Sequence, residues 1–184
     1  MNLTIREAQS SELPIILAMV KEAFGADEGA EVATLISDLI ADPTASPLLS
    51  LVAMVDEKIV GHILFTKVQI EGSKASSVPA SILCPLAVSP NYQKRGIGGQ
   101  LIRTGLEQLK NQGVQLVFVL GYPAYYTRYG FSPAGVHGLN APYEIAPENT
   151  DAWMLQELQP GIAEAISGVI TCADCLHDPK YWQE

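Results

Sequence analysis

"SPNYQKRGIGGQLIRTG", residues 89–105, joins an apolar run to an apolar helical pattern. The run before it, residues 82–88, reads ILCPLAV and has the composition of a buried strand. A strand, a glycine-rich turn and a helix start together place backbone N–H groups around an anion. The stretch therefore predicts an anion-binding turn. The helical face after the turn consists of Ile97, Leu101, Ile102, Leu106 and Leu109.

Two common phosphate-binding motifs do not fit this turn. The dinucleotide-binding motif G-x-G-x-x-G needs a third glycine, and counting from Gly96 and Gly98 that position holds Leu101. The P-loop needs Gly-Lys followed by Ser or Thr, and the chain has no such triplet. Both motifs are therefore excluded on a residue that each of them requires.

Two segments resemble motifs of the GCN5-related N-acetyltransferase (GNAT) superfamily. Residues 93–98, QKRGIG, follow a strand ending in Leu-Ala-Val and match the pyrophosphate-binding motif Q/R-x-x-G-x-G/A. Residues 119–131, VLGYPAYYTRYGF, contain a Tyr, three residues and then Gly-Phe, and are similar to the YhbS-like subgroup. The resemblance covers residues 1–133 well, and AWMLQELQPG at residues 152–161 is similar but less diagnostic.

This resemblance implies the fold and the cofactor. The expected fold class is mixed α/β, with a central, mostly antiparallel sheet, a splayed parallel pair and flanking helices. Residues 1–184 are expected to form a single domain, in which residues 1–133 are the GNAT-like core and residues 134–184 add C-terminal strands and a tail. The implied co-substrate is acetyl-CoA. The residues implied to bind it are Leu86, Ala87, Val88, Gln93, Lys94, Arg95, Gly96, Ile97, Gly98 and Gly99.

The local patterns predict alternating strands and helices around these motifs. Gly25 is expected to separate two helices, residues 10–24 and 30–41, and Pro85 suits an interrupted strand ladder. A small polar loop is expected at residues 73–77. The remaining predicted helices are residues 97–111 and 123–129, and the predicted strands are residues 3–8, 48–55, 59–70, 82–88, 114–120, 152–158 and 168–172.

Tyr126 occupies the family's general-acid position. A phenol with a pKa of about 10 can donate a proton to a thiolate whose conjugate acid has a pKa near ~8.5, if it lies within hydrogen-bond reach. Tyr125, about 100° around the same helix, is the alternative donor. Four tyrosines crowd this helix, so an aromatic packing role for Tyr126 stays open. Backbone N–H groups of residues 86–88 are expected to polarise the thioester carbonyl.

The general base is not identified by any motif. Glu22, Asp27, Glu28 and Glu31 lie in the region where this family shapes its acceptor pocket, although acids on helix surfaces are usually only solvated. His62 lies in a strand pattern, where a half-buried structural histidine is a simpler interpretation than a catalytic base.

The cysteines predict a reducing compartment and no metal. Three cysteines without framework spacing indicate a cytoplasmic location. Cys172 and Cys175, followed by His177, have zinc-like local spacing but lack a nearby fourth ligand. Two reduced thiols are therefore expected there, and Cys84 is expected to be a small buried residue.

The charge distribution favours a small anionic ligand. Residues 72–106 contain four Lys or Arg and no Asp or Glu, so this window carries +4 and the rest of the chain −9 − 4 = −13. The net charge of −9 argues against nucleic acid as a partner. No apolar run approaches the ~20 residues of a membrane helix, and no signal peptide is visible. The acidic remainder either attracts a cationic substrate or only aids solubility.

Together these observations predict an N-acetyltransferase. Acetyl would move from acetyl-CoA to a primary amine of a small molecule or protein, by direct attack in a ternary complex. A non-catalytic acyl-CoA-binding or sensing domain, another acyl group, and a hydroxyl acceptor remain alternatives. The segment after Phe131 is expected either to cap the acceptor pocket or to mediate formation of a homodimer.

Overall fold

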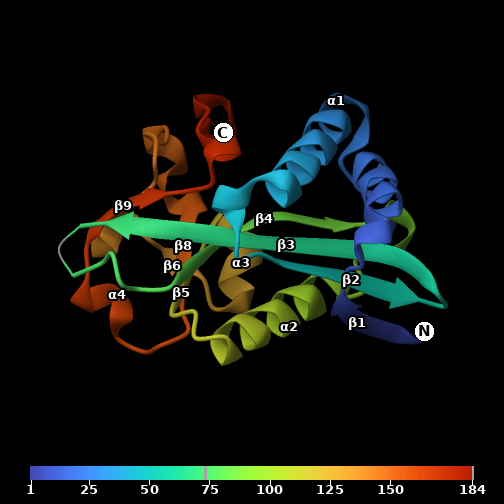
Figure 1. Ribbon diagram of the computed structural model, residues 1–184, viewed down its shortest axis with the longest axis horizontal. Helices are drawn as coiled ribbons and strands as arrows, with labels where there is room; N and C mark the ends of the chain where they lie inside the picture. Colours follow the sequence, from blue (N-terminus) through green and yellow to red (C-terminus); the bar gives the residue numbers. More distant parts are fainter. Residues whose placement is uncertain (73, 184) are drawn as a thin grey trace.

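The computed structural model describes residues 1–72 and 74–183 (Figure 1). The α-helices of the described residues are α1 (Leu13–Ala41), α2 (Ile97–Asn111), α3 (Pro123–Tyr126) and α4 (Ile162–Ala165). The strands are β1 (Leu3–Glu7), β2 (Leu49–Val55), β3 (Lys58–Glu71), β4 (Ala80–Val88), β5 (Leu116–Leu120), β6 (Ser132–Pro133), β7 (Leu139–Asn140), β8 (Trp153–Glu157) and β9 (Gly168–Thr171).

The strands form a mostly antiparallel sheet in the order β1-β2-β3-β4-β5-β8-β6. Strands β4 and β5 pair in parallel, while β9 extends the end of β3 and also pairs in parallel with β7. The helices flank this sheet, so the predicted mixed α/β fold class is confirmed.

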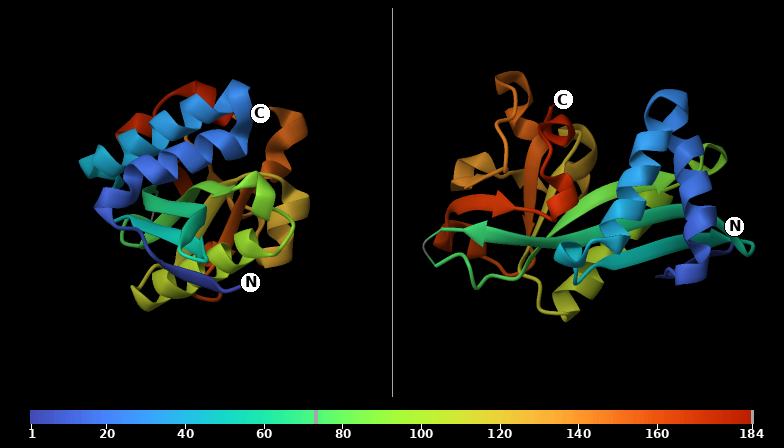
Figure 2. Two further views of the ribbon diagram at one scale, coloured as in Figure 1. Left: turned by 90° about the vertical axis from the view of Figure 1, so that its right-hand side faces the viewer. Right: turned by 45° about the horizontal axis from the view of Figure 1, so that its top comes forward.

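The two long helices cover opposite faces of the sheet (Figures 1 and 2). Side chains of β3 alternate between the two faces, as the period of a strand requires. Leu64 packs in the core beneath α1 with Ile36, whereas Phe65 packs beneath α2 with Ile102. Each long helix therefore has its own apolar layer against the same strands.

Gly25 divides α1 into two arms, as the sequence predicts. It has φ 84° and ψ −177°, a conformation that only glycine adopts readily. The helix resumes directly afterwards, earlier than the expected start at residue 30. Figure 2 shows the two arms lying across the same face of the sheet, with a sharp bend between them.

Strands β4 and β5 separate after a short parallel contact. Their paired residues run only from Ala80 with Leu116 to Ile82 with Phe118. Along its other edge β4 stays paired with β3, but the register shifts where Leu83 opposes Phe65 and Leu86 opposes Ile63. Such a bulge bends a strand and increases its twist, which accounts for the divergence from β5. Pro85 lies within this interruption, as predicted.

The C-terminal part of the chain completes the sheet. Strands β8 and β9 were expected, but β6, β7 and α4 were not, because segments of two to four residues are too short to show periodicity. The expected loop at residues 73–77 is described from Lys74 onward, and Ser73 lies outside the described residues. No helix within residues 1–72 and 74–183 combines the length and apolar character needed to cross a membrane.

Candidate active site

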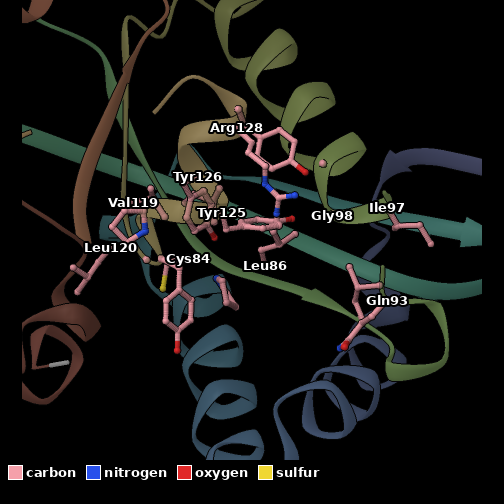
Figure 3. Close-up of a pocket in the computed structure, with 18 of the residues that line it drawn as sticks. Cys84, Leu86, Gln93, Ile97, Gly98, Val119, Leu120, Tyr125, Tyr126 and Arg128 are labelled. Atoms are coloured by element: carbon pink, nitrogen blue, oxygen red, sulfur yellow. The ribbon is translucent and has the colours of Figure 1, made fainter. Parts of the chain in front are cut away.

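A cavity of about 1210 Å³ opens where β4 and β5 separate. Strand β4 supplies one wall and the end of β5 another, while the β4–α2 turn and the residues around α3 line the rest. Pairs of residues from α1 and from the 3-10 helix Pro147–Ala152 also reach it. Figure 3 shows Tyr125 and Tyr126 between the Ile97–Gly98 part of the wall and the Val119–Leu120 part.

The glycine-rich turn has a backbone suited to an anion. Lys94 and Gly96 both adopt left-handed conformations, with φ 62° and 81°. The Gln93 side-chain amide donates to the Val88 carbonyl at 2.9 Å and ties the turn to the end of β4. Helix α2 then begins at Ile97 without a side-chain cap. Uncapped N–H groups and the positive end of the helix dipole favour an anion at this point.

Gly98 and Gly99 face tyrosines rather than open space. A Cβ on Gly98 would lie 2.5 Å from the Tyr125 hydroxyl, and one on Gly99 would lie 2.5 Å from that of Tyr129. Space around a Cβ on Gly96 is open, with no heavy atom of the described residues within 4 Å. Gly96 therefore leaves room for a ligand, whereas Gly98 and Gly99 admit the two phenols.

Most of the predicted cofactor-binding residues meet in this cavity. Ala87 does not line it, because alternation along β4 turns its methyl group into the core beneath α1. Arg95 does not line it either, and its guanidinium lies over the Tyr92 ring at 5.2 Å. The predicted residues that do line the cavity are Leu86, Val88, Gln93, Lys94, Gly96, Ile97, Gly98 and Gly99.

Tyr126 is held in the wall by its neighbours. Its ring packs edge-on against Phe131 and Tyr125, with centroids 5.6 and 5.1 Å away. Gly121, directly after β5, lies against the same ring, where a Cβ would collide with it. The half-buried ring of Tyr126 therefore packs among aromatic neighbours and also lines the cavity.

Tyr125, the alternative donor, is a weak acid. Burial, together with the neighbouring Tyr129 hydroxyl, raises the pKa of Tyr125 to about 12, although the nearby Arg128 acts in the opposite direction. A phenol with a higher pKa releases its proton less readily to a thiolate. The raised pKa therefore counts against Tyr125 as the proton donor.

Arg128 lines the cavity, although it is not among the residues predicted from the motifs. Its guanidinium lies over the ring of Tyr125 at 5.0 Å and that of Tyr129 at 5.9 Å. It therefore adds a second cation to Lys94 in the cavity wall. Its position in the Tyr-x-x-x-Gly-Phe segment was visible, but nothing in the sequence indicated that the segment folds against the glycine-rich turn.

The other candidates separate clearly. Of the four acids proposed near the acceptor pocket, Glu28 lines the cavity, and Glu22, Asp27 and Glu31 do not. His62 is fully buried rather than half-buried, and it lies outside the cavity lining. Cys84, which was expected to be buried, is only partly buried and lines the cavity. Within residues 1–72 and 74–183, no cluster of three or more His, Cys, Asp or Glu side chains is arranged to hold a metal ion.

A mixed sheet that opens beside a glycine-rich helix start is the architecture of the GNAT acetyltransferases. The chain belongs to this family, since the family model described as an acetyltransferase (GNAT) domain matches residues 4–134. It is 44% identical over 174 residues to the uncharacterized N-acetyltransferase YjhQ of Escherichia coli K12, covering 93% of this chain and 92% of YjhQ. It is 31% identical over 160 residues to the uncharacterized N-acetyltransferase YhbS of that strain, covering 86% of this chain and 89% of YhbS.

Two solved structures share the fold closely. The crystal structure of Escherichia coli YhbS in complex with CoA has a TM-score of 0.81 and 29% identity, covering 92% of this chain and 89% of YhbS. A GNAT family acetyltransferase from Brucella melitensis in complex with acetyl-CoA has a TM-score of 0.72 and 27% identity, covering 95% of this chain and 97% of the Brucella chain. These likenesses confirm the resemblance that the two motifs indicated.

Proposed function

We propose that this protein transfers an acetyl group from acetyl-CoA to a primary amine. The observation that carries the proposal is the cavity between β4 and β5, because the glycine-rich turn and Tyr126 both line it. The relatives solved with CoA and with acetyl-CoA share this fold over most of both chains. The family supplies the reaction type, and the cavity supplies the residues for it.

The cavity offers separate features for the two parts of the cofactor. The open space at Gly96, the uncapped start of α2 and the cations Lys94 and Arg128 suit a pyrophosphate. The edge of β4 that β5 leaves after Ile82 suits the extended pantetheine arm, which carries amide groups that can pair with a strand. Backbone N–H groups contribute more here than Lys94, since an exposed cation adds under ~1 kcal/mol.

The chemistry assigned to this chain is a direct transfer. The neutral amine nitrogen attacks the thioester carbonyl, an N–C bond forms, and the C–S bond then breaks to release the thiolate. The Tyr126 hydroxyl donates its proton to this thiolate, while the amine releases a proton to water. Backbone N–H groups of residues 86–88 stabilise the negative charge that develops on the carbonyl oxygen.

The Tyr126→Phe variant tests the proposal. It keeps the ring packing against Phe131 but removes the proton donor, so we expect kcat to fall about 100-fold while the Kd for acetyl-CoA changes less than about twofold. Steady-state kinetics with an amine panel and calorimetric titration with acetyl-CoA measure the two quantities. Tyr143→Phe, which removes a hydroxyl away from this cavity, is the matched control.

The outcomes separate the alternative functions. Tight acetyl-CoA binding without turnover on any amine supports a binding or sensing domain, and turnover with a hydroxyl acceptor or a longer acyl-CoA redefines the substrates. An unchanged kcat in Tyr126→Phe removes the general-acid role. The cytoplasmic location and the homodimer remain predictions, and light scattering of the purified protein tests the second.

A further inference from the structure

The bend in α1 places Glu28 at the cavity. Gly25 takes the chain out of helical conformation at the bend, and Gly29 is buried against the backbone of Lys21, where a Cβ would collide with the Lys21 carbonyl. The two arms of α1 therefore meet closely at their junction. Phe24 and Glu28 flank Gly25 on the two arms, and both line the cavity.

Charge is distributed unevenly among the elements that line the cavity. Lys94 and Arg128 belong to the turn and to the tyrosine segment, whereas Glu28 belongs to α1. Among the described lining residues, Glu28 is the only carboxylate and these two are the only Lys or Arg. Lys94 and Arg128 suit the phosphates of the cofactor. The Glu28 carboxylate does not suit them, so we assign it to the second substrate.

The chain around Glu28 and on the facing wall is acidic. Residues 22–57, which include the bend, hold eight Asp or Glu and no Lys or Arg. Residues 129–179, which include Asn149 and Ala152 of the lining, hold seven Asp or Glu and again no Lys or Arg. Acids concentrated in the two segments that contribute to the cavity attract cations to this part of the molecule.

We propose that Glu28 selects an acceptor that carries a second positive charge, namely a small aliphatic diamine or polyamine. One amine is neutral and attacks the thioester, and a second, protonated amine pairs with the Glu28 carboxylate while Phe24 covers the aliphatic chain between them. Glu28 acts as a specificity-determining residue rather than as the general base. This inference rests on the proposed acetyl transfer and names the substrate class of the same site.

The test compares two amines with the same four-carbon chain on matched variants. Putrescine carries a second, terminal ammonium group where butylamine carries only a hydrogen atom. In Glu28→Gln we expect the KM for putrescine to rise about fourfold with kcat within about twofold, because one charge-assisted contact of an exposed carboxylate is lost. The KM for butylamine should change less than about twofold. Glu107→Gln, an exposed acid on α2 outside the cavity, is the control for the loss of one charge.

The results distinguish this inference from the proposed function. Equal KM values for the two amines in the wild-type protein, or equal effects of Glu28→Gln on both, overturn the role of Glu28 and leave acetyl transfer intact. A fall in kcat with both amines and a shifted pH profile assigns Glu28 to proton transfer and also overturns it. Acetyl-CoA binding without transfer to either amine removes the diamine class, and absence of acetyl-CoA binding removes the proposed function itself.

Discussion

At the scale of single residues, Gly99 shows how closely the start of α2 and the tyrosine segment fit. A Cβ at Gly99 would lie 2.5 to 2.9 Å from atoms of the Tyr129 ring, which also lies under the guanidinium of Arg103. Overpacking of this kind costs about 1–3 kcal/mol. We expect Gly99→Ala to lower the free energy of unfolding by that amount in urea titrations.

A second substitution tests the cause of this loss. Tyr129→Ala removes the ring that the new methyl group meets, so Gly99→Ala should be nearly neutral in that background, by a double-mutant cycle. Gly135→Ala is the control, since no described heavy atom lies within 4 Å of a Cβ there and its φ is not in the left-handed region. Additive losses in the double variant would show that Tyr129 is not the obstacle.

His62 makes the folded protein sensitive to mild acid. Its Nε2 lies 2.8 Å from the Ser50 hydroxyl, its Nδ1 has no hydrogen-bond partner among the described residues, and burial lowers its pKa to about 4. The unfolded chain takes up this proton near pH 6.5, whereas the folded chain does so only near pH 4. The contribution of His62 to the free energy of unfolding is therefore fully present above pH 6.5, and it is lost as the pH falls from 6.5 toward 4.

We expect this histidine to lower the free energy of unfolding by about 2 kcal/mol between pH 7 and pH 5. Urea titrations at the two pH values measure the loss, and His62→Leu should remove most of it. The window lies above the range in which Glu12 and Asp42 titrate, since hydrogen bonds lower the pKa of each carboxyl to about 2. An equal loss in His62→Leu would assign the effect to other groups.

At the scale of elements, Asp42 and Thr44 fasten the C-terminal tail to the end of α1. Asp42 Oδ1 accepts from the backbone N–H and the hydroxyl of Thr44, at 2.8 and 2.6 Å. Asp42 Oδ2 accepts from the N–H of Cys175 at 3.1 Å, and the Thr44 hydroxyl accepts from the N–H of Asp174 at 2.8 Å. Two residues thus join parts of the chain 130 or more positions apart.

Asp42→Ala should release this tail before it unfolds the sheet. Loss of a cap typically costs about 1 kcal/mol, so we expect a loss of that size together with faster amide exchange over residues 174–182. Hydrogen exchange read by mass spectrometry locates the effect, and Glu107→Ala, an exposed acid on α2, is the control. Uniformly faster exchange across the sheet would contradict a local clasp.

The long elements were predictable because their signals are local. The break at Gly25, the hairpin of β2 and β3, and the start of α2 after the glycine-rich turn follow from residue type and apolar spacing. The clasp at Asp42 was not predictable, because its partners are distant in sequence and its bonds use backbone N–H groups. Cys175 illustrates the same limit, since the metal-like spacing of its segment gave no hint of this contact.

At the scale of the whole molecule, the sequence predicted which motifs form the site but not all the residues that face it. Ala87 and Arg95 belong to the predicted set, yet strand alternation turns one away and the Tyr92 ring holds the other outside the cavity. Nothing in the sequence distinguished Glu28 from the other three candidate acids, whereas in the structure it lies just after the bend of α1 and lines the cavity. Side-chain direction depends on packing between elements, which no single segment encodes.

The charge of the whole molecule leads to a prediction about salt. The net charge is −9, and fifteen of the twenty Asp and Glu residues lie in residues 22–57 and 129–179, two segments that both contribute lining residues to the cavity. A field of this kind speeds the approach of cations and is screened over a Debye length of about 10 Å at 0.1 M salt. Raising NaCl from about 0.05 M to about 0.5 M should therefore raise the KM for putrescine about tenfold, but that for butylamine only about threefold.

The difference between the two amines is the informative quantity, because any general effect of salt on the enzyme acts on both. Sodium sulfate at equal ionic strength controls for specific anion binding at the glycine-rich turn, and the acetyl-CoA concentration is kept saturating at each salt level. If the two KM values rise in parallel, the acidic segments act on solubility alone, and the preference for a doubly charged acceptor must come from direct contact with Glu28.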